Sequence, residues 1–244
     1  MFTEKYKIAD KVVQVTSIYE QVHRLCQDYR TDAPADYAVS VTEADLQLEA
    51  ETSRKSALKE GRKPCVSTPE YLEELAVYRK IAEKMPDYDT FLFHGSVIAV
   101  DGQAYLFTAK SGTGKSTHTR LWREMFGERA VMVNDDKPLI RISGETVTVF
   151  GTPYNGKHRL GCNIAVPLKA VCILNRGEQN HIEKITKSEA YTMLLQQVYH
   201  PMDTIQMKKT LMLIDTLAVR VGLYRLHCNI NPSAAEIAYN AMKG

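Results

Sequence analysis

The spacing of apolar and polar residues changes about one third of the way along the chain. Before residue 90, short apolar runs alternate with charged helical patterns, which predict strands over residues 8–16 and 38–41 and helices over 18–29, 42–59 and 68–85. Ser17, Thr42 and Thr68 stand at the starts of these helices, where a side-chain oxygen can cap the first turn. We expect residues 1–89 to form an N-terminal α/β accessory unit.

From residue 90 onward, strand patterns dominate. Two apolar runs, residues 91–100 and 103–108, flank Asp101-Gly102, a dipeptide that favours the two-residue turn of a β-hairpin. Further patterns predict strands over 130–134, 139–143, 146–150, 166–174 and 223–228, and helices over 115–126, 188–198, 203–221 and from a cap at Ser233 onward. The chain is therefore expected to be an α/β protein whose second unit, residues 90–244, folds around a mixed sheet.

Residues 109–117 have the sequence AKSGTGKST, the pattern of a phosphate-binding (Walker A) loop in which Ala109 replaces the usual first glycine. The glycines let successive N–H groups point inward as an anion nest, and Ala109 fits if its φ is negative. Lys115 can reach the β- and γ-phosphates, and Ser116 can hold Mg²⁺. The alternative is a Gly/Ser-rich turn with an accidental lysine. We expect a nucleoside triphosphate to bind to Ser111, Gly112, Thr113, Gly114, Lys115, Ser116 and Thr117.

Two aspartates, Asp135 and Asp136, end the apolar strand downstream of this loop. Phosphate-loop proteins place the carboxylate that binds Mg²⁺ at such a strand end. We expect Asp135 to bind the metal and Asp136 to accept the proton of an attacking hydroxyl. Without the loop, the pair would fit a solvated turn.

Two further segments carry candidate site residues. His94 lies within the strand expected over residues 91–100, where it is either an active-site group or a core residue. The loop 151–159 combines glycine and proline with cationic side chains, and we expect a lid that brings Lys157 or Arg159 to the γ-phosphate; the alternative is an exposed connection. Two arginines of the helix after the phosphate loop are expected to be solvated: Arg120 and Arg123.

Composition narrows the class of protein. A hydrophobic fraction of 44% with 25% charged residues is typical of a soluble globular protein. The chain has neither a membrane-spanning apolar run nor an N-terminal signal-peptide core, so we expect a cytoplasmic protein. A net charge of +2 without basic blocks argues against nucleic acid as a partner. The five scattered cysteines support neither a disulfide framework nor a zinc site.

The pair His94-Gly95, the hairpin, the loop 111–116 and the pair Asp135-Asp136 together resemble the catalytic domain of HPr kinase/phosphorylase. That domain has the phosphoenolpyruvate carboxykinase-like nucleotide fold, and the similarity covers roughly residues 90–240. The resemblance implies that Lys115 binds phosphate, Ser116 binds Mg²⁺, Asp136 accepts the proton and His94 is the active-site histidine.

The chain departs from that family in three places. The acidic Glu-Val-Arg-Gly motif of that family is missing from this chain, and Gly151-Thr152-Pro153 occupies roughly the position of the motif. The N-terminal unit differs from the family's own, and the C-terminal docking segment for HPr is not recognisable. The chain thus resembles a divergent member, similar to kinases found beside peptide-modification systems, and resemblance to this family implies a homo-oligomer.

These observations predict a kinase that uses ATP and Mg²⁺ to phosphorylate a hydroxyl, with serine in a peptide or protein as the favoured acceptor. The expected catalytic residues are Asp136, Lys115, His94 and Arg159. Phosphorylation of a small metabolite fits the same residues. A third interpretation is a nucleotide-dependent binding module with slow ATPase activity, in which residues 1–89 recruit a partner.

Overall fold

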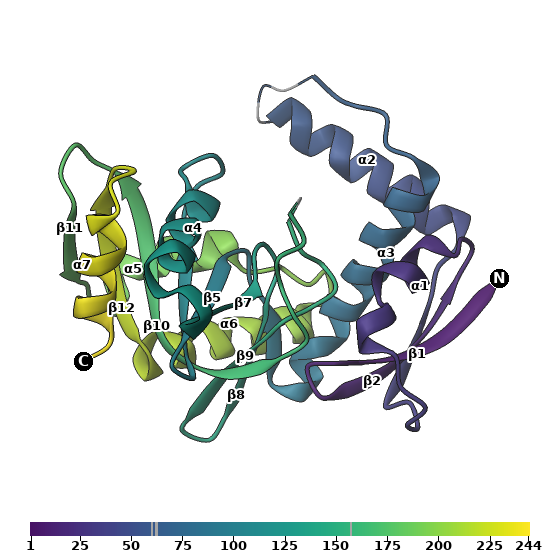
Figure 1. Cartoon of the computed structure of the whole chain (residues 1–244). Helices are drawn as coiled ribbons and strands as arrows, with labels where there is room; N and C mark the ends of the chain where they lie inside the picture. Colours follow the sequence, from purple (N-terminus) through teal and green to yellow (C-terminus); the bar gives the residue numbers. More distant parts are fainter. Residues whose placement is uncertain (60, 62, 157) are drawn as a thin grey trace. The chain divides into compact units, whose positions relative to one another are not determined.

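The computed structural model describes residues 1–59, 61, 63–156 and 158–244. The chain divides into two compact units, Met1–Lys84 and Met85–Gly244 (Figure 1). None of the helices in the described residues combines the length and apolar character needed to cross a bilayer.

The first unit contains a small sheet. β1 (Phe2–Ile8) and β2 (Lys11–Ser17) form an antiparallel hairpin, and β3 (Tyr37–Ser40) pairs with β2 in parallel. The hairpin turn lies at Ala9 and Asp10, whose φ angles are 47° and 57°. The sheet therefore has the order β1-β2-β3.

Helices complete the first unit: α1 (Gln21–Leu25), α2 (Glu43–Lys59) and α3 (Pro69–Lys84), with a 3₁₀ turn at Gln27–Tyr29. The N–H and Oγ1 of Thr42 both donate to Asp45 Oδ2 at 2.9 Å, so Asp45 supplies its half of a capping box, whereas Thr42 Oγ1 is a donor and not the expected acceptor. Thr68 Oγ1 accepts the N–H of Tyr71 at the start of α3. The predicted starts of both long helices are confirmed.

Two expectations for the first unit are wrong. The single strand expected over residues 8–16 is the end of β1, the hairpin turn and most of β2. Ser17 does not cap a helix; it ends β2, and its Oγ donates to Tyr19 O and lies 2.7 Å from His23 Nε2. The contact that fixes this segment is tertiary: the carboxylate of Glu73 in α3 accepts the N–H groups of the two residues after Ser17, and α1 begins only at Gln21.

The second unit is built on a mixed sheet. Its strands are β4 (Thr90–Leu92), β5 (Ser96–Val100), β6 (Gln103–Thr108), β7 (Ala130–Asn134), β8 (Leu139–Ser143), β9 (Thr146–Phe150), β10 (Ala165–Arg176), β11 (His181–Lys184) and β12 (Gly222–Cys228). The order is β4-β8-β9-β10-β6-β5-β7, with β12 beside β10 and β11 beside β12. β10 pairs antiparallel with β9 at its start and parallel with β6 and β12 further on. This change of partners curls the sheet.

The expected hairpin before the glycine-rich run is confirmed. β5 and β6 are antiparallel, and their turn residues Asp101 and Gly102 have φ angles of 51° and 77°. Positive φ at both positions is the geometry that matches the twist of the strands. β6 leads into the glycine-rich run with β5 on one side and the parallel strand β10 on the other.

The strand expected over residues 91–100 is broken into β4 and β5, so His94 lies between strands and not within one. At the break, the N–H of His94 donates to Gln197 O at 2.7 Å, and the N–H of Gly95 donates to Asp136 O at 3.0 Å. Both acceptors are far away in sequence, which is why the apolar run alone suggested one continuous strand.

Helices cover both faces of the sheet in the second unit (Figure 1). α4 (Lys115–Phe126) and α7 (Ser233–Met242) share a core with Phe107. α5 (Lys187–Gln197) and α6 (Thr204–Arg220) share the opposite core with Leu106. Leu106 and Phe107 are successive residues of β6, so their side chains point to opposite faces.

The expected extents of α4, α5 and α6 are confirmed within a residue or two, and Asp203 caps α6 through bonds to two N–H groups. Ser233, expected as a cap, is instead the first residue of α7, and its N–H donates to Asn231 Oδ1. Short 3₁₀ turns occupy Met85–Tyr88 and Gly127–Arg129. Because the Asn231 side chain accepts this N–H from two residues earlier in the chain, the helix already begins at Ser233 and not after it.

Candidate functional site

The segment between β6 and α4, residues 109–114, is a tight turn that we call the glycine loop. Gly112 and Gly114 have φ angles of 76° and 123°, which other residues rarely adopt. The N–H and Oγ1 of Thr113 donate to Lys110 O at 3.2 and 2.8 Å and close the loop. Ala109 is buried and its φ is not positive, so a methyl group fits in place of the usual glycine.

The start of α4 faces this loop. No side chain caps the helix at Gly114 within the described part of the chain, so the N–H groups of its first turn can bind an anion. Lys115 Nζ folds back toward Ala109 O at 3.4 Å. Burial lowers the pKa of Lys115, and the charge of Asp136 opposes that shift. The N–H groups of the first turn of α4 and the ammonium group of Lys115 therefore surround the same space.

Asn134 orients the acidic pair at the end of β7. It is buried, and its Oδ1 accepts the N–H groups of Asp136 and Lys137 at 2.9 and 2.6 Å. Its Nδ2 donates to Thr152 Oγ1 at 3.1 Å. The sequence places Asn134 next to the aspartates, but only the structure shows its contact with Thr152 and therefore its role in positioning them.

The two carboxylates have different surroundings. Asp135 is 8% exposed, and its Oδ1 accepts the N–H of Gly156 at 2.7 Å. Asp136 Oδ1 lies 3.3 Å from His94 Nε2, and its Oδ2 lies 3.4 Å from Lys137 Nζ. Burial raises the pKa of Asp136, but the hydrogen bond from His94 and the nearby charge of Lys137 outweigh it and hold that pKa below its usual value.

His94 is held between two elements. Its Nδ1 lies 2.8 Å from Gln197 Oε1 at the end of α5, opposite the nitrogen that faces Asp136. Gln197 was missed by the sequence interpretation, since nothing in a helical pattern distinguishes it from other surface glutamines. The contact orients the imidazole ring toward the carboxylate.

One cavity of about 450 Å³ joins most of the expected site residues: His94, Ser111, Gly112, Gly114, Lys115, Ser116, Thr117, Asp135 and Asp136. Gly156 and His158 also line it, although the sequence interpretation assigned neither a role. Thr113 lines a neighbouring cavity. Arg159 is exposed, with a φ of 47°, and is not among the described residues that line the cavity. Lys157 lies outside the described residues.

The first half of the expected lid is packed into the protein. Residues 151–154 are buried, and Thr152 Oγ1 donates to Lys137 O at 2.9 Å. A β-carbon on Gly151 would lie 1.8 Å from Cys162 O, so glycine here permits close backbone packing. The expectation of a mobile loop across 151–159 does not fit this half. His158 and Arg159 are its exposed described residues.

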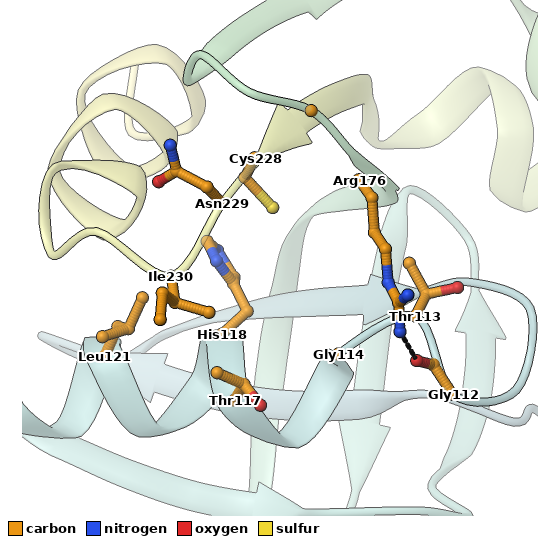
Figure 2. A pocket seen from close by; sticks show the side chains of 11 residues that line it. Gly112, Thr113, Gly114, Thr117, His118, Leu121, Arg176, Cys228, Asn229 and Ile230 are labelled. Atoms are coloured by element: carbon orange, nitrogen blue, oxygen red, sulfur yellow. Dashed lines mark hydrogen bonds between the residues drawn. The ribbon is translucent and has the colours of Figure 1, made fainter.

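A second cavity, of about 430 Å³, adjoins the glycine loop (Figure 2). It shares Gly112, Gly114 and Thr117 with the first. Arg176, the last residue of β10, lines it and donates from Nη2 to Gly112 O at 2.7 Å. His118 also lines it, and burial lowers the pKa of this imidazole to about 4.

A third cavity, of about 360 Å³, lies along α4 beside Ser116 and Asp135. Arg120 and Arg123 line it. Arg120 is exposed and pairs with Glu124, as its expected solvation implies. Arg123 differs from the expectation: it is half-buried, and its Nε has no hydrogen-bond partner among the described residues. This cavity therefore has a cationic wall.

Ser116 and Asp135 are the residues that could hold a divalent cation. They line the same cavity, although no cluster of three or more histidine, cysteine, aspartate or glutamate side chains suited to a metal occurs in the described residues. Mg²⁺ usually keeps several waters and binds through one or two carboxylates together with substrate phosphates. The donor set fits Mg²⁺ brought in with a polyphosphate, and not a site made of protein ligands alone.

A family model described as "SynChlorMet cassette protein ScmC" matches residues 68–232, which is more than half of the chain. No curated protein matches the chain. Among solved structures, the chain is similar to the Hpr(Ser) kinase/phosphatase from Coxiella burnetii, with 10% sequence identity and a TM-score of 0.32 over 63% of this chain and 99% of that one.

Proposed function

The chain belongs to the SynChlorMet cassette protein ScmC family, and from the geometry of its site we propose that it is a kinase that transfers the γ-phosphoryl group of ATP, with Mg²⁺, to a hydroxyl group. A serine of a peptide or protein is the favoured acceptor. The observation that carries the proposal is the single cavity that joins the glycine loop, Lys115, Ser116 and both aspartates. Anion donors, a cation and two carboxylates in one space are the parts that phosphoryl transfer requires.

The glycine loop and the first turn of α4 would bind the phosphates through N–H groups, and Lys115 would neutralise charge on the β- and γ-phosphates. Ser116 and Asp135 would hold Mg²⁺, which supplies further neutralisation of phosphate charge. Asp135 is preset for this role because the Gly156 N–H fixes one of its oxygens.

In the transfer step, the acceptor oxygen forms a bond to the γ-phosphorus, the bond from that phosphorus to the bridging oxygen breaks, and ADP leaves. The hydroxyl proton passes to the Asp136 carboxylate. With a pKa held below its usual value, Asp136 is ionised at neutral pH and can accept the proton. A carboxylate with a low pKa is a weak base, but in a loose transition state orientation of the hydroxyl matters most. His94 and Lys137 hold the carboxylate in place.

A small anionic metabolite with a hydroxyl group is the second candidate acceptor. It is favoured by Arg123, a half-buried residue that lines the third cavity together with Ser116 and Asp135. A peptide whose serine is flanked by acidic residues would also place negative charge near Arg123 in the third cavity. Both acceptors use the same transfer chemistry.

The proposal is tested by incubating the full chain with γ-labelled ATP, Mg²⁺ and a lysate of its host, with the Lys115→Ala variant as the control. Label transferred to a protein band or a small molecule by the wild type only is the expected result, and the labelled species identifies the acceptor class. Tight binding of ATP without any acceptor-dependent release of ADP would contradict the proposal and favour a nucleotide-dependent binding module.

A further inference from the structure

The second cavity adjoins the glycine loop but lies outside the space that holds the carboxylates (Figure 2). Its walls come from the first turns of α4, the end of β10 and the segment that follows β12. Leu121 and Ile230 give it apolar surface, whereas His118 and Arg176 add polar groups. A ligand that filled both cavities would place an anionic chain on the loop and a partly apolar group here.

The protonation of His118 follows from its neighbour. The His118 side chain is almost completely buried, and its Nε2 accepts a hydrogen bond from Trp122 Nε1 at 3.0 Å. An indole nitrogen can only donate, so Nε2 carries no proton and the ring proton sits on Nδ1. Edge contact with Phe107, at 4.5 Å between ring centroids, also holds the ring in place.

The Nδ1–H of His118 has no hydrogen-bond partner among the described residues. Buried polar groups in proteins nearly always have one, so an orphaned donor at a cavity wall indicates a missing ligand or water. Figure 2 shows the ring standing between α4 and the segment that carries Cys228, Asn229 and Ile230. Because His118 lines the second cavity, this buried donor lies in the wall of that cavity.

Arg176 ties this cavity to the loop. Its Nη2 donates to Gly112 O at 2.7 Å, which holds the guanidinium at the border between cavity and loop (Figure 2). A guanidinium plane is a surface on which a flat aromatic ring can stack. The cavity thus offers a planar cation, apolar side chains and one buried N–H donor.

We propose that this cavity is the nucleobase subsite of the triphosphate, that it takes a purine, and that the His118 Nδ1–H donates to a ring nitrogen of the base. The inference rests on the proposed triphosphate binding at the glycine loop. A purine suits the cavity because its two fused rings present a large apolar face for stacking, and its unprotonated ring nitrogens can accept the N–H of His118. The carbonyl oxygens of uracil could also accept this bond, but its single ring presents a smaller face.

The test uses the full chain and two matched variants, His118→Asn and His118→Leu. Both remove the acceptor of Trp122, but the asparagine amide keeps an N–H donor near the position of Nδ1 and leucine does not. Calorimetry would measure the binding of Mg·ATP, Mg·UTP and Mg·tripolyphosphate. We expect His118→Leu to weaken ATP about fivefold, the effect of one lost hydrogen bond, with ATP binding to His118→Asn near wild type and tripolyphosphate unchanged in both.

Three analogues that each replace one ring nitrogen by carbon, 1-deaza-, 3-deaza- and 7-deaza-ATP, locate the acceptor atom. One of them should bind the wild type about fivefold more weakly than ATP does. His118→Leu should not distinguish that analogue from ATP. The first half of this comparison needs only the wild type, so it can overturn the role of His118 even if His118→Leu does not fold.

Equal affinity of the wild type for ATP and all three analogues would overturn the role of His118. Binding of UTP as tight as that of ATP would overturn the purine preference, and ATP no tighter than tripolyphosphate would overturn the subsite. Failure of the proposed triphosphate binding at the glycine loop looks different: the wild type would then bind neither tripolyphosphate nor ATP.

Discussion

His94 Nε2 lies 3.3 Å from Asp136 Oδ1, and the two residues come from different segments that meet only in the folded chain. His94 follows β4, and Asp136 follows β7. The backbone makes a second contact between the same two segments, in which the N–H of Gly95 donates to Asp136 O. The carboxylate is therefore oriented before any substrate arrives, and this agrees with the role proposed for it in accepting a proton.

Lys115→Ala should remove nearly all phosphoryl transfer and weaken the binding of Mg·ATP, because the loop lysine is the main cation on the β- and γ-phosphates. The matched control is Lys110→Ala, which removes an exposed lysine from the same loop. Binding is measured by calorimetry and transfer by release of label. Wild-type turnover in Lys115→Ala would show that the loop is structural only.

Asp136→Asn should lower turnover by roughly 10²–10⁴, the usual effect of a positioned general base, while Mg·ATP affinity stays within a few-fold of wild type. Single-turnover kinetics separates the transfer step from binding. Asp135→Asn should instead raise the Mg²⁺ concentration needed for half-maximal activity. If the metal dependence changes in Asp136→Asn and not in Asp135→Asn, the roles of the two residues are reversed.

Arg123→Ala should raise the KM for the acceptor about tenfold with little effect on ATP binding, because its guanidinium lines the cavity beside Ser116 and Asp135. Arg129→Ala is the control, since Arg129 pairs with Asp101 at the protein surface. Arg159→Ala tests the lid expected from the sequence. A loss of acceptor phosphorylation in Arg159→Ala but not in Arg123→Ala would place the acceptor against the lid.

Asp45 should make the first unit sensitive to acid. Burial raises its pKa, but hydrogen bonds from Lys80 and Thr42 outweigh this and hold the pKa at about 2, below the usual 3.8. A lowered carboxyl pKa stabilises the fold above pH 3.8, and this contribution is lost as the pH falls from about 4 to about 2.

Hydrogen exchange in α2 and α3 across this pH range measures the effect. In Asp45→Asn the acid-dependent loss of stability should be smaller by about 1–2 kcal/mol. Asp32→Asn, at an exposed position, is the control. The same pH dependence in wild type and Asp45→Asn would show that the ion pairs of Asp45 contribute nothing.

Gly151→Ala should destabilise the second unit by about 3 kcal/mol, because an added β-carbon would lie 1.8 Å from Cys162 O and 2.6 Å from Val133 O. Backbone atoms cannot move aside as a flexible side chain can. Thermal unfolding compares the variant with Gly244→Ala, a change with no atom within 4 Å. An unchanged melting temperature in Gly151→Ala would mean that β9 and the segment before β10 separate at little cost.

Local chemistry was enough for the sequence to determine several elements. The strands β7, β8 and β9 and the helix α4 have the expected extents, since their patterns of apolar positions are strong and their ends carry turn residues. The hairpin turn at Asp101-Gly102 follows from backbone preferences, and the start of α6 after Asp203 follows from the two N–H groups that bond to its side chain. The glycine loop likewise depends on residues adjacent in the chain.

Tertiary structure alone decided how these parts meet. Only folding showed that His94 leaves the sheet to face Asp136 and Gln197, and that Thr152 holds the Asn134 side chain that orients the aspartates. Only folding showed, too, that His118 has a donor without a partner among the described residues. The physical reason is that these arrangements depend on which distant segments pack together, as for His94 with Asp136 and Asn134 with Thr152. Residue patterns report which face of an element is apolar, but not which polar group it meets across the core.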